Sequence, residues 1–313
     1  MAWSAAEGEA GDMRSLTRIW QTALWEWGGA IRSRRALVLL LLYLASAVLC
    51  MNGTISILGK MEKELATMLQ LPDSGETGVV SASLWKSKPF NRIVRSVVGE
   101  SPVLDDISGR HPVELLYAWF VFFCAPLLTV LVAGTRISDD LRSGAVRYML
   151  VRETRLEWSV GKYVGQALMI GVALAASAVG AAAVVFCRLP SGTAASLFLP
   201  MLNWGMRAWV YSLAWLGLAL GLSHITRSPG RATAYGILAI CLFGALPPLM
   251  DFAHSVGGWP AAVTQVRMLV PAGAEMSLWR FSAAPLLSGT FHLVTLGFVY
   301  LMAGAAVFSR SDV

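Results

Sequence analysis

Charged side chains are scarce in this chain. Asp, Glu, Lys and Arg make up 14% of its 313 residues, whereas 56% of the residues are hydrophobic. This composition excludes a water-soluble globular protein and indicates an integral membrane protein. The net charge of +6 is not gathered into one basic stripe, because the basic residues flank apolar runs. That distribution argues against a nucleic-acid partner.

Motifs for catalysis and for nucleotide or metal binding are also missing. The sequence contains no G-x-x-x-x-G-K-[ST] phosphate loop, no HExxH and no GxSxG, and its four cysteines form no CxxC pair. Titratable residues are nearly absent from the middle of the apolar runs, which leaves no convincing site for ion-coupled transport. His292 is more typical of a helix-packing hydrogen bond than of a proton relay. We therefore predict no catalytic residue, no metal site and no directly bound cofactor.

Apolar runs dominate what is there, and six of them are long enough to cross a bilayer. About 20 residues suffice, since a helix rises about 1.5 Å per residue. Arg207 falls near the outer end of the fourth run, where an arginine can snorkel toward water. The predicted fold is an all-α integral membrane protein with spans at residues 36–58, 113–134, 163–187, 201–222, 232–250 and 286–308.

The segment before the first span divides into two parts. Residues 1–12 are small and acidic, and we expect them to be disordered. Residues 13–35 are predicted to form an amphipathic helix on the inner membrane surface. The apolar residues that recur there at helical spacing are Leu16, Ile19, Trp20, Ala23, Leu24 and Trp27.

A charged segment at residues 135–162 separates the second and third spans. Basic residues exceed acidic ones in it, which indicates a cytoplasmic loop of a plasma (bacterial inner) membrane protein with both termini cytoplasmic. Ile137, Leu141, Ala145 and Tyr148 recur at helical spacing and predict a short amphipathic helix over residues 137–150. Orientation explains the arginines of this segment, but it explains neither its two adjacent aspartates nor its glycine.

Two other segments are predicted to lie outside the membrane on the opposite side. Residues 59–112 form a long polar loop, which is large enough to build a helical cap or to dock a partner protein; a plain connector is an equal alternative. Residues 251–285 contain apolar pieces that are too short to cross, so we expect surface or re-entrant helices there.

The charged segment resembles the first cytoplasmic loop of the membrane subunits of type-2 ABC exporters. The resemblance rests on the run Ser138–Leu150 (SDDLRSGAVRYML), on Arg155, and on Gly161-Lys162 at the start of the third span. The chain end, FSRSDV, is similar to the Phe-x-Arg-Arg-Asp ending of that family. Glu153 stands where the family commonly has proline, which puts the rigidity of the loop after the helix in doubt.

The resemblance implies a permease subunit that pairs with a second permease copy and with separate ATPase subunits, which would hold ATP and Mg²⁺. Such a complex exports a substrate or performs work on an extracytoplasmic partner. By this resemblance, the N-terminal helix (Leu16, Ile19, Trp20 and Trp27) is a second contact to the ATPase. For Arg155 and Lys162, binding to lipid phosphates is an equal alternative to a role in ATPase coupling. The residues implied in ATPase coupling are Asp139, Asp140, Arg142, Gly144, Arg147, Leu150, Arg155 and Lys162.

Two rival functions come from other classes of protein. An intramembrane enzyme requires a group of polar residues in the middle of the membrane, and the sequence offers none. A structural or receptor-like membrane anchor has no need of the loop pattern at residues 138–162. We therefore expect a transporter subunit rather than an enzyme.

Overall fold

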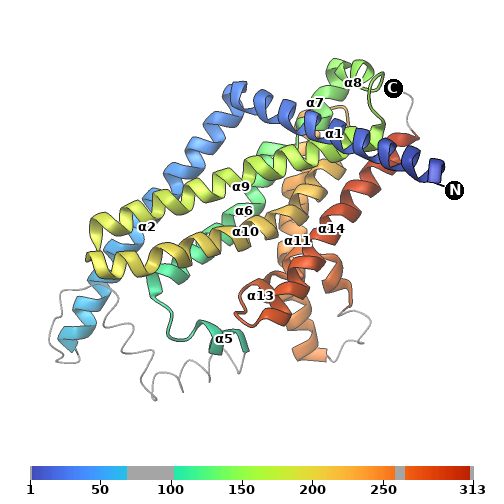
Figure 1. Ribbon diagram of the computed structural model, residues 1–313. Coiled ribbons are helices and arrows are strands. Elements are labelled where there is room, and N and C mark those ends of the chain that lie inside the picture. Colours follow the sequence, from blue (N-terminus) through green and yellow to red (C-terminus); the bar gives the residue numbers. More distant parts are fainter. Residues whose placement is uncertain (1, 69–101, 258–264, 311–313) are drawn as a thin grey trace.

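The computed structural model describes residues 2–68, 102–257 and 265–310, and every regular element in these ranges is a helix (Figure 1). The elements are α1 (Ala2–Arg32), α2 (Arg34–Met68), α5 (Pro102–Ile107), α6 (Pro112–Ala133), α7 (Arg136–Ser143), α8 (Ala145–Met149), α9 (Arg155–Arg188), α10 (Ser191–Ile225), α11 (Pro229–Gly257), η1 (Arg267–Leu269), η2 (Pro271–Gly273), α13 (Glu275–Leu278) and α14 (Ala283–Ser309).

Helices α2, α6, α9, α10, α11 and α14 contain stretches that are long and apolar enough to cross a membrane, which confirms the prediction of an all-α protein with six spans. All of them except α6 are longer than predicted, and α10 begins at Ser191 instead of residue 201. Helix α2 continues past residue 58 to Met68, through a run of strong helix formers. Helix α9 begins at Arg155 instead of residue 163, because Thr154 and Glu157 form a capping box that starts the helix there.

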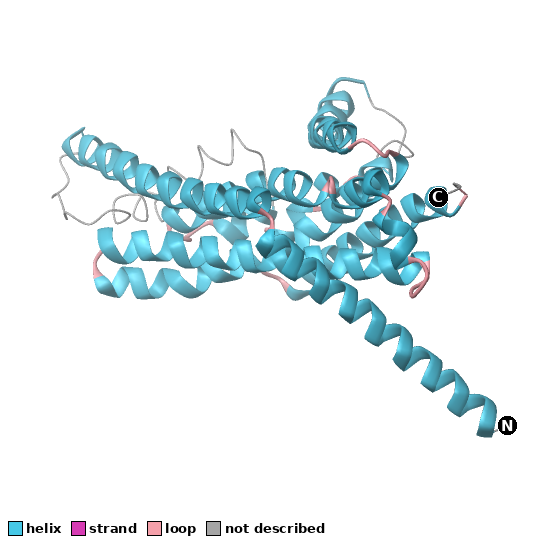
Figure 2. Ribbon diagram, turned by 90° about the horizontal axis from the view of Figure 1, so that it is seen from above, coloured by secondary structure: helices cyan, strands magenta, loops and turns pink. Residues whose placement is uncertain are grey.

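The N-terminal helix also differs from the prediction. Residues 2–12 belong to α1 in the structure, whereas the sequence predicted a disordered segment over residues 1–12. Small residues such as Ala do not oppose a helix, and α1 propagates through them from its docked part. Figure 2 shows this first part of α1 running out beyond the other helices.

Helix α10 forms the centre of the bundle and packs against α6, α9 and α14. In its most apolar window 78% of the residues are buried, against 11% for α11, which lies at the periphery. Glycines bring α10 and α14 together: a Cβ atom placed on Gly217 would lie 1.9 Å from the carbonyl oxygen of Gly297. Small residues at such a crossing allow the close backbone contact that stabilises helix pairs in membranes.

Helices α9 and α10 form a long antiparallel hairpin, seen as a tilted pair in Figure 1. They contain 34 and 35 residues and are joined by a short turn. Near this turn Arg188 donates hydrogen bonds to Asn52 Oδ1 and Ser56 Oγ, both at 3.0 Å. The second half of α2 is thereby fastened to the tip of the hairpin.

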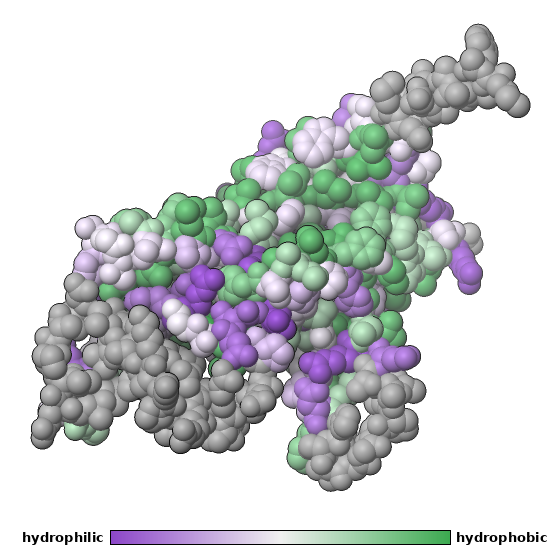
Figure 3. Space-filling model, turned by 60° about the horizontal axis from the view of Figure 1, so that its bottom comes forward, coloured by the Kyte–Doolittle hydropathy of each residue, from purple (hydrophilic) through white to green (hydrophobic). Residues whose placement is uncertain are grey.

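The bundle has two polar ends. The α1 end carries α1, α7 and α8, and the α13 end carries α5, η1, η2 and α13 (Figure 1). The short helices η1, η2 and α13 match the surface or re-entrant helices expected within residues 251–285; residues 258–264 lie outside the described ranges. On the α13 end, hydrophilic residues gather in the middle of the face, with apolar residues on the flank above them (Figure 3).

A buried arginine organises the α13 end. The guanidinium group of Arg207 in α10 donates hydrogen bonds to the carbonyl oxygens of Leu278 (2.7 Å) and Arg280 (3.0 Å). Its central carbon also lies 4.4 Å from the ring centre of Phe281 and 4.9 Å from that of Trp204. Only 6% of Arg207 is exposed, so the expectation that it snorkels to water is wrong. The side chain instead fixes the segment after α13 onto α10.

Two carboxylates complete this end. Asp106 of α5 accepts hydrogen bonds from Arg280 Nε (2.5 Å) and from the amide of Phe281 (3.2 Å). Glu114, at the start of α6, accepts from the indole of Trp204 at 2.9 Å and lies 3.8 Å from Arg110. The arginine contact holds the pKa of Asp106 below its ordinary value. These contacts join α5, α6, α10 and the segment after α13.

Candidate functional site

The charged segment folds as two short helices rather than the single predicted one. Helix α7 ends at Ser143 and α8 begins at Ala145, and Gly144 between them has φ = 73°. Only glycine adopts this left-handed conformation without strain. A Cβ atom on Gly144 would meet nothing within 4 Å in the chain, so within this chain the glycine serves the turn and not a close approach of two backbones.

Helix α1 lies across the start of α9, and two glycines of α9 form the contact. A Cβ atom on Gly161 would lie 2.6 Å from Thr22 Cβ, and one on Gly165 would lie 2.8 Å from the carbonyl oxygen of Ala23. The spacing Gly161-x-x-x-Gly165 places both on one face of α9, so that the two helices pack closely.

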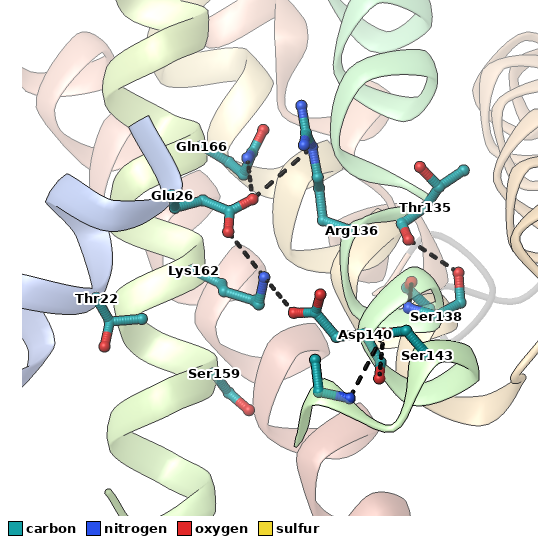
Figure 4. A network of polar contacts seen from close by, with 12 residues as sticks. Thr22, Glu26, Thr135, Arg136, Ser138, Asp140, Ser143, Ser159, Lys162 and Gln166 are labelled. Atoms are coloured by element: carbon teal, nitrogen blue, oxygen red, sulfur yellow. Dashed lines mark hydrogen bonds and ion pairs between the residues drawn. The ribbon is translucent and has the colours of Figure 1, made fainter. Parts of the chain in front are cut away.

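A network of charges lies where α1, α7 and α9 meet (Figure 4). The ammonium group of Lys162 in α9 lies 2.7 Å from a carboxylate oxygen of Glu26 in α1 and 2.7 Å from one of Asp140 in α7. Gln166 Nε2 donates to the other Glu26 oxygen at 2.7 Å, and Arg136 lies 3.7 Å from the same oxygen. One lysine therefore holds three helices together.

The network is balanced and mostly shielded from water. The side chain of Lys162 is 6% exposed and that of Glu26 is 12% exposed. Burial alone raises the pKa of Glu26, but Lys162 and Arg136 outweigh burial, and the pKa lies below its ordinary value. Two cationic and two anionic side chains thus share the junction, which is the arrangement that allows charges to be buried.

A second set of contacts ties α1 to the chain after α8. The hydroxyl of Thr22 lies 2.7 Å from both carboxylate oxygens of Glu153 and donates to this group. Arg18 lies 3.6 Å from Glu157, whose carboxylate also accepts from the amide of Thr154. Glu153, which departs from the proline of the resembled family, thus fastens its loop to α1. The contact compensates for the absence of the stiffness that a proline would give.

Two further contacts hold this region to the bundle. The amide of Ser138 in α7 donates to Ser223 Oγ of α10 at 2.9 Å. Arg155 Nη1 donates to the carbonyl oxygen of Phe308 at 2.6 Å, and its guanidinium carbon lies 4.8 Å from the Phe308 ring. Arg155 thus binds the last turn of α14, where a cation is favourable to the helix dipole.

A cleft of about 710 Å³ opens between α1 and the chain around α8. Large apolar side chains at its rim are exposed to solvent: Trp25 by 74%, Tyr148 by 82% and Val151 by 84%. Glu26, Trp158 and Lys162 also line it. The remaining lining residues are Arg18, Gln21, Thr22, Met149, Arg152 and Glu153.

The structure divides the residues that the sequence singled out into two groups. Asp140, Arg155 and Lys162 bind other parts of the same chain, and burial of Lys162 excludes the lipid-phosphate alternative for it. The other residues remain available: Asp139 is half-buried and forms no ion pair with a described residue, Arg142 and Arg147 are exposed, and Leu150 is partly buried against the core.

The N-terminal helix shows the same division. Ile19 and Trp27 are partly buried, whereas Leu16 and Trp20 are exposed. Ala23, which belongs to the same predicted stripe, is 1% exposed because it packs on Gly165 of α9.

Sequence reasoning missed the acidic partners in this region. No role was predicted for Glu26, and Glu153 stood out only as a departure from the proline of the resembled family. The pattern Thr154-x-x-Glu157 was a readable signal, since it is the capping-box sequence that starts a helix. Nothing in the sequence links Glu26 to Lys162, because they are 136 residues apart.

The described residues contain no group of three or more His, Cys, Asp or Glu side chains that could hold a metal ion. Within the same ranges all four cysteines are free thiols. The contacts of this junction are therefore hydrogen bonds, ion pairs and packing.

Comparison with known proteins adds one finding. The model of a family described as ABC-2 family transporter protein matches residues 20–313. No curated protein matches the chain.

Proposed function

Because this chain belongs to the ABC-2 family of transporter proteins and is a membrane permease component of an ABC transporter, we propose that separate ATPase subunits dock on its α1 end and drive export. In an alternative form of the proposal, the ATP-driven conformational change performs mechanical work on a partner beyond the membrane. In this proposal the α1 end faces the cytoplasm, both termini are cytoplasmic, and residues 59–112 lie outside.

The cleft beside α1 is the observation that carries the proposal. Trp25, Tyr148 and Val151 are large apolar side chains exposed at an end of the molecule that is otherwise rich in charge. Exposed apolar patches with a polar rim are typical of protein-binding surfaces. The arginines around them, Arg142, Arg147 and Arg152, suit a partner with acidic side chains.

The charge network supports a coupling role for the same region. Asp140 in α7 and Glu26 in α1 bind one lysine on α9, so a displacement of either element pulls on the third span. Contacts made by the two remaining coupling candidates, Asp139 and Leu150, would add to the docking surface. ATP and Mg²⁺ would be held by the partner, since this chain has no phosphate loop.

Distribution of charge supports the proposed orientation. The segments joined at the α1 end carry most of the arginines and lysines of the short connections, as cytoplasmic loops do. A second permease copy is part of the proposal, because six spans without a second internal half do not enclose a two-fold pathway. The membrane would be the plasma (bacterial inner) membrane.

Docking can be tested with an ABC ATPase whose gene lies beside that of this chain. We expect Tyr148→Ala with Val151→Asp to weaken co-purification of the ATPase by about 30-fold or more, since anchoring aromatic residues contribute about 2 kcal/mol or more. Leu199→Ala is the matched control, because Leu199 is also 70% exposed but lies on α10. Unchanged binding by the double variant would remove the support for the docking surface.

Orientation has its own test. In a background without native cysteines, Ser143→Cys at the end of α7 and Ser196→Cys near the start of α10 place thiols at exposed positions. An impermeant thiol reagent should label them from opposite sides of sealed vesicles. Labelling of Ser143→Cys from the outside would reverse the orientation proposed above.

A further inference from the structure

The elbow between α1 and α2 carries an arginine cluster that the proposed docking surface does not include. Arg32 is the last residue of α1, and Arg34 and Arg35 are the first residues of α2. All three side chains are exposed. They lie at the start of the first span, the depth at which lipid phosphates are found.

Other arginines near the α1 end have partners within the protein. Arg18 lies beside Glu157, Arg136 beside Glu26, and Arg155 on the last turn of α14. For the elbow arginines the described part of the chain provides no carboxylate within 4 Å. Three adjacent exposed cations without an internal anion repel one another unless an external anion lies between them.

The exposed face of α1 shows where the membrane surface lies. Leu16, Trp20, Leu24 and Ile31 are each exposed by 52–65% and recur every four to seven residues, so they form one stripe. The opposite face bears Arg18, Gln21 and Trp25, which line the cleft. An apolar stripe with tryptophan is typical of a helix seated in the interfacial region of a bilayer. The stripe ends at Ile31, directly before the arginine cluster.

We propose that the elbow arginines Arg32, Arg34 and Arg35 bind the phosphate headgroup of an anionic phospholipid. The stripe inserts beside the acyl chains, and the guanidinium groups meet the phosphate layer at the point where α1 turns into α2. Arginine suits this ligand because its planar fork donates two hydrogen bonds to one phosphate. A lipid at the elbow fixes the angle of α1, and α1 forms one wall of the cleft.

Native mass spectrometry of the purified chain in detergent tests this site directly. Phosphatidylglycerol and phosphatidylcholine with identical acyl chains are titrated separately, and bound lipids are counted. We expect wild type to prefer phosphatidylglycerol and Arg32→Gln/Arg34→Gln/Arg35→Gln to lose that preference. The ratio of the affinities for phosphatidylglycerol and phosphatidylcholine should fall about fivefold per arginine and about a hundredfold in total. This expectation follows from the attraction of basic residues to anionic membrane surfaces.

Two variants serve as controls. The triple variant Arg32→Lys/Arg34→Lys/Arg35→Lys keeps the charge and should keep part of the preference for phosphatidylglycerol. This result would also show that substitution does not unfold the elbow. Arg142→Gln/Arg147→Gln/Arg152→Gln removes the same charge from the α7–α8 region and should leave lipid binding unchanged. Equal loss in both glutamine variants would show a diffuse charge effect and overturn the site.

A competition experiment separates a lipid from a soluble phosphate. Inorganic phosphate and glycerol phosphate at millimolar concentration should not displace phosphatidylglycerol, because neither can also use the apolar stripe. Displacement by inorganic phosphate would identify a site for soluble anions and contradict the proposal. Unchanged lipid binding in Arg32→Gln/Arg34→Gln/Arg35→Gln would also contradict the proposal.

Discussion

At the α1 end Lys162 lies between two carboxylates, whereas at the α13 end Arg207 lies among carbonyl oxygens and aromatic rings. Both cations are almost fully buried. The lysine pairs with full negative charges from two other helices, and the arginine pairs with dipoles and with ring faces. Removal of the lysine therefore leaves uncompensated charge in the protein, while removal of the arginine leaves neutral carbonyl groups.

The two ends should also respond differently during transport. An ion network exchanges partners when charges shift, so a docked protein can rearrange it. Carbonyl groups and stacked rings respond mainly to geometry and are less sensitive to charge. The two ends should thus differ in how strongly single substitutions act and in how they respond to pH.

The largest effect is expected for Lys162→Met. Glu26, which is largely buried, and Asp140, which is partly buried, would lose their shared cation, and loss of one partner of a buried pair typically costs about 3–5 kcal/mol. We expect a lower thermal unfolding temperature and faster amide exchange over residues 15–32. The triple variant Glu26→Gln/Asp140→Asn/Lys162→Met removes the charges together and should restore most of the loss. An equal effect of single and triple variants would assign the contact to packing.

A smaller effect is expected for Arg207→Met. Hydrogen bonds from a charged donor contribute about 1.5–3 kcal/mol, and both acceptors of Arg207 are neutral carbonyl oxygens. Amide exchange should rise over residues 275–282 and stay unchanged at the α1 end. Arg207→Lys retains the charge but not the flat group that stacks on Phe281. Its amide exchange over residues 275–282 should therefore lie between that of Arg207→Met and that of wild type. A larger effect than that of Lys162→Met would contradict the distinction between the two ends.

Gly144→Ala tests the turn between α7 and α8. A left-handed conformation costs a residue other than glycine about 1–2 kcal/mol. Gly192→Ala is the matched control, since a Cβ atom there also meets nothing within 4 Å and its backbone is not left-handed. Thermal unfolding should respond to the first substitution alone. Equal responses would mean that α7 and α8 tolerate a continuous helix.

The smallest effect concerns acid. The pKa of Glu26 is lowered in the folded protein, so its contribution to stability is fully present above its ordinary value of 4.5 and is lost as pH falls through the folded pKa. We expect α1 to stay docked at neutral pH and to loosen only below pH 4.5, as followed by amide exchange. Glu26→Gln should reduce that pH dependence, and the remainder should come from Glu157, whose pKa is also lowered by Thr154 and by Arg18 of α1. Loosening above pH 5 would require another titrating group.

The pKa of Asp106 is lowered in the same direction, chiefly by the hydrogen bond from Arg280. Acid should therefore weaken the α5 contact as well, below the ordinary value of 3.8 for this carboxyl. Arg207 and its carbonyl acceptors do not titrate in this range. Asp106→Asn should then remove the acid response of the α5 contact, as followed by amide exchange over residues 102–107, and a response that persists there would place the titrating group elsewhere.

The spans were predictable because a membrane imposes length and apolarity on each helix, and both are local properties of the sequence. The family was predictable from the run at residues 138–162. The helix break at Gly144 was harder, since the apolar periodicity continues across it and the glycine alone does not reveal its φ angle. Periodicity describes faces, whereas the backbone turn depends on one residue.

Contacts between distant segments were not predictable. Lys162 was predicted either to take part in ATPase coupling or to bind lipid phosphates, and only the docking of α1 on Gly161 and Gly165 brings Glu26 to it. Arg207 read as a snorkelling residue, because its carbonyl partners belong to a segment about 70 residues further on. In both cases tertiary packing decided the role of a charged residue that local rules assign to water.

The length of the α9–α10 hairpin has a mechanical consequence. At about 1.5 Å per residue, the 34 residues of α9 extend about 51 Å, whereas the hydrocarbon layer is about 30 Å thick. Even at a tilt of about 40°, the upper end of the usual range, the helix covers about 39 Å along the membrane normal. The ends of α9 therefore project beyond the hydrocarbon layer. A thinner bilayer favours a larger tilt of such a long helix, and its projecting start contacts α1 through Gly161 and Gly165. We expect thinner bilayers to swing α1 and reshape the cleft, which reconstitution in lipids of different chain length, with ATPase turnover as the readout, would detect as a change in coupling.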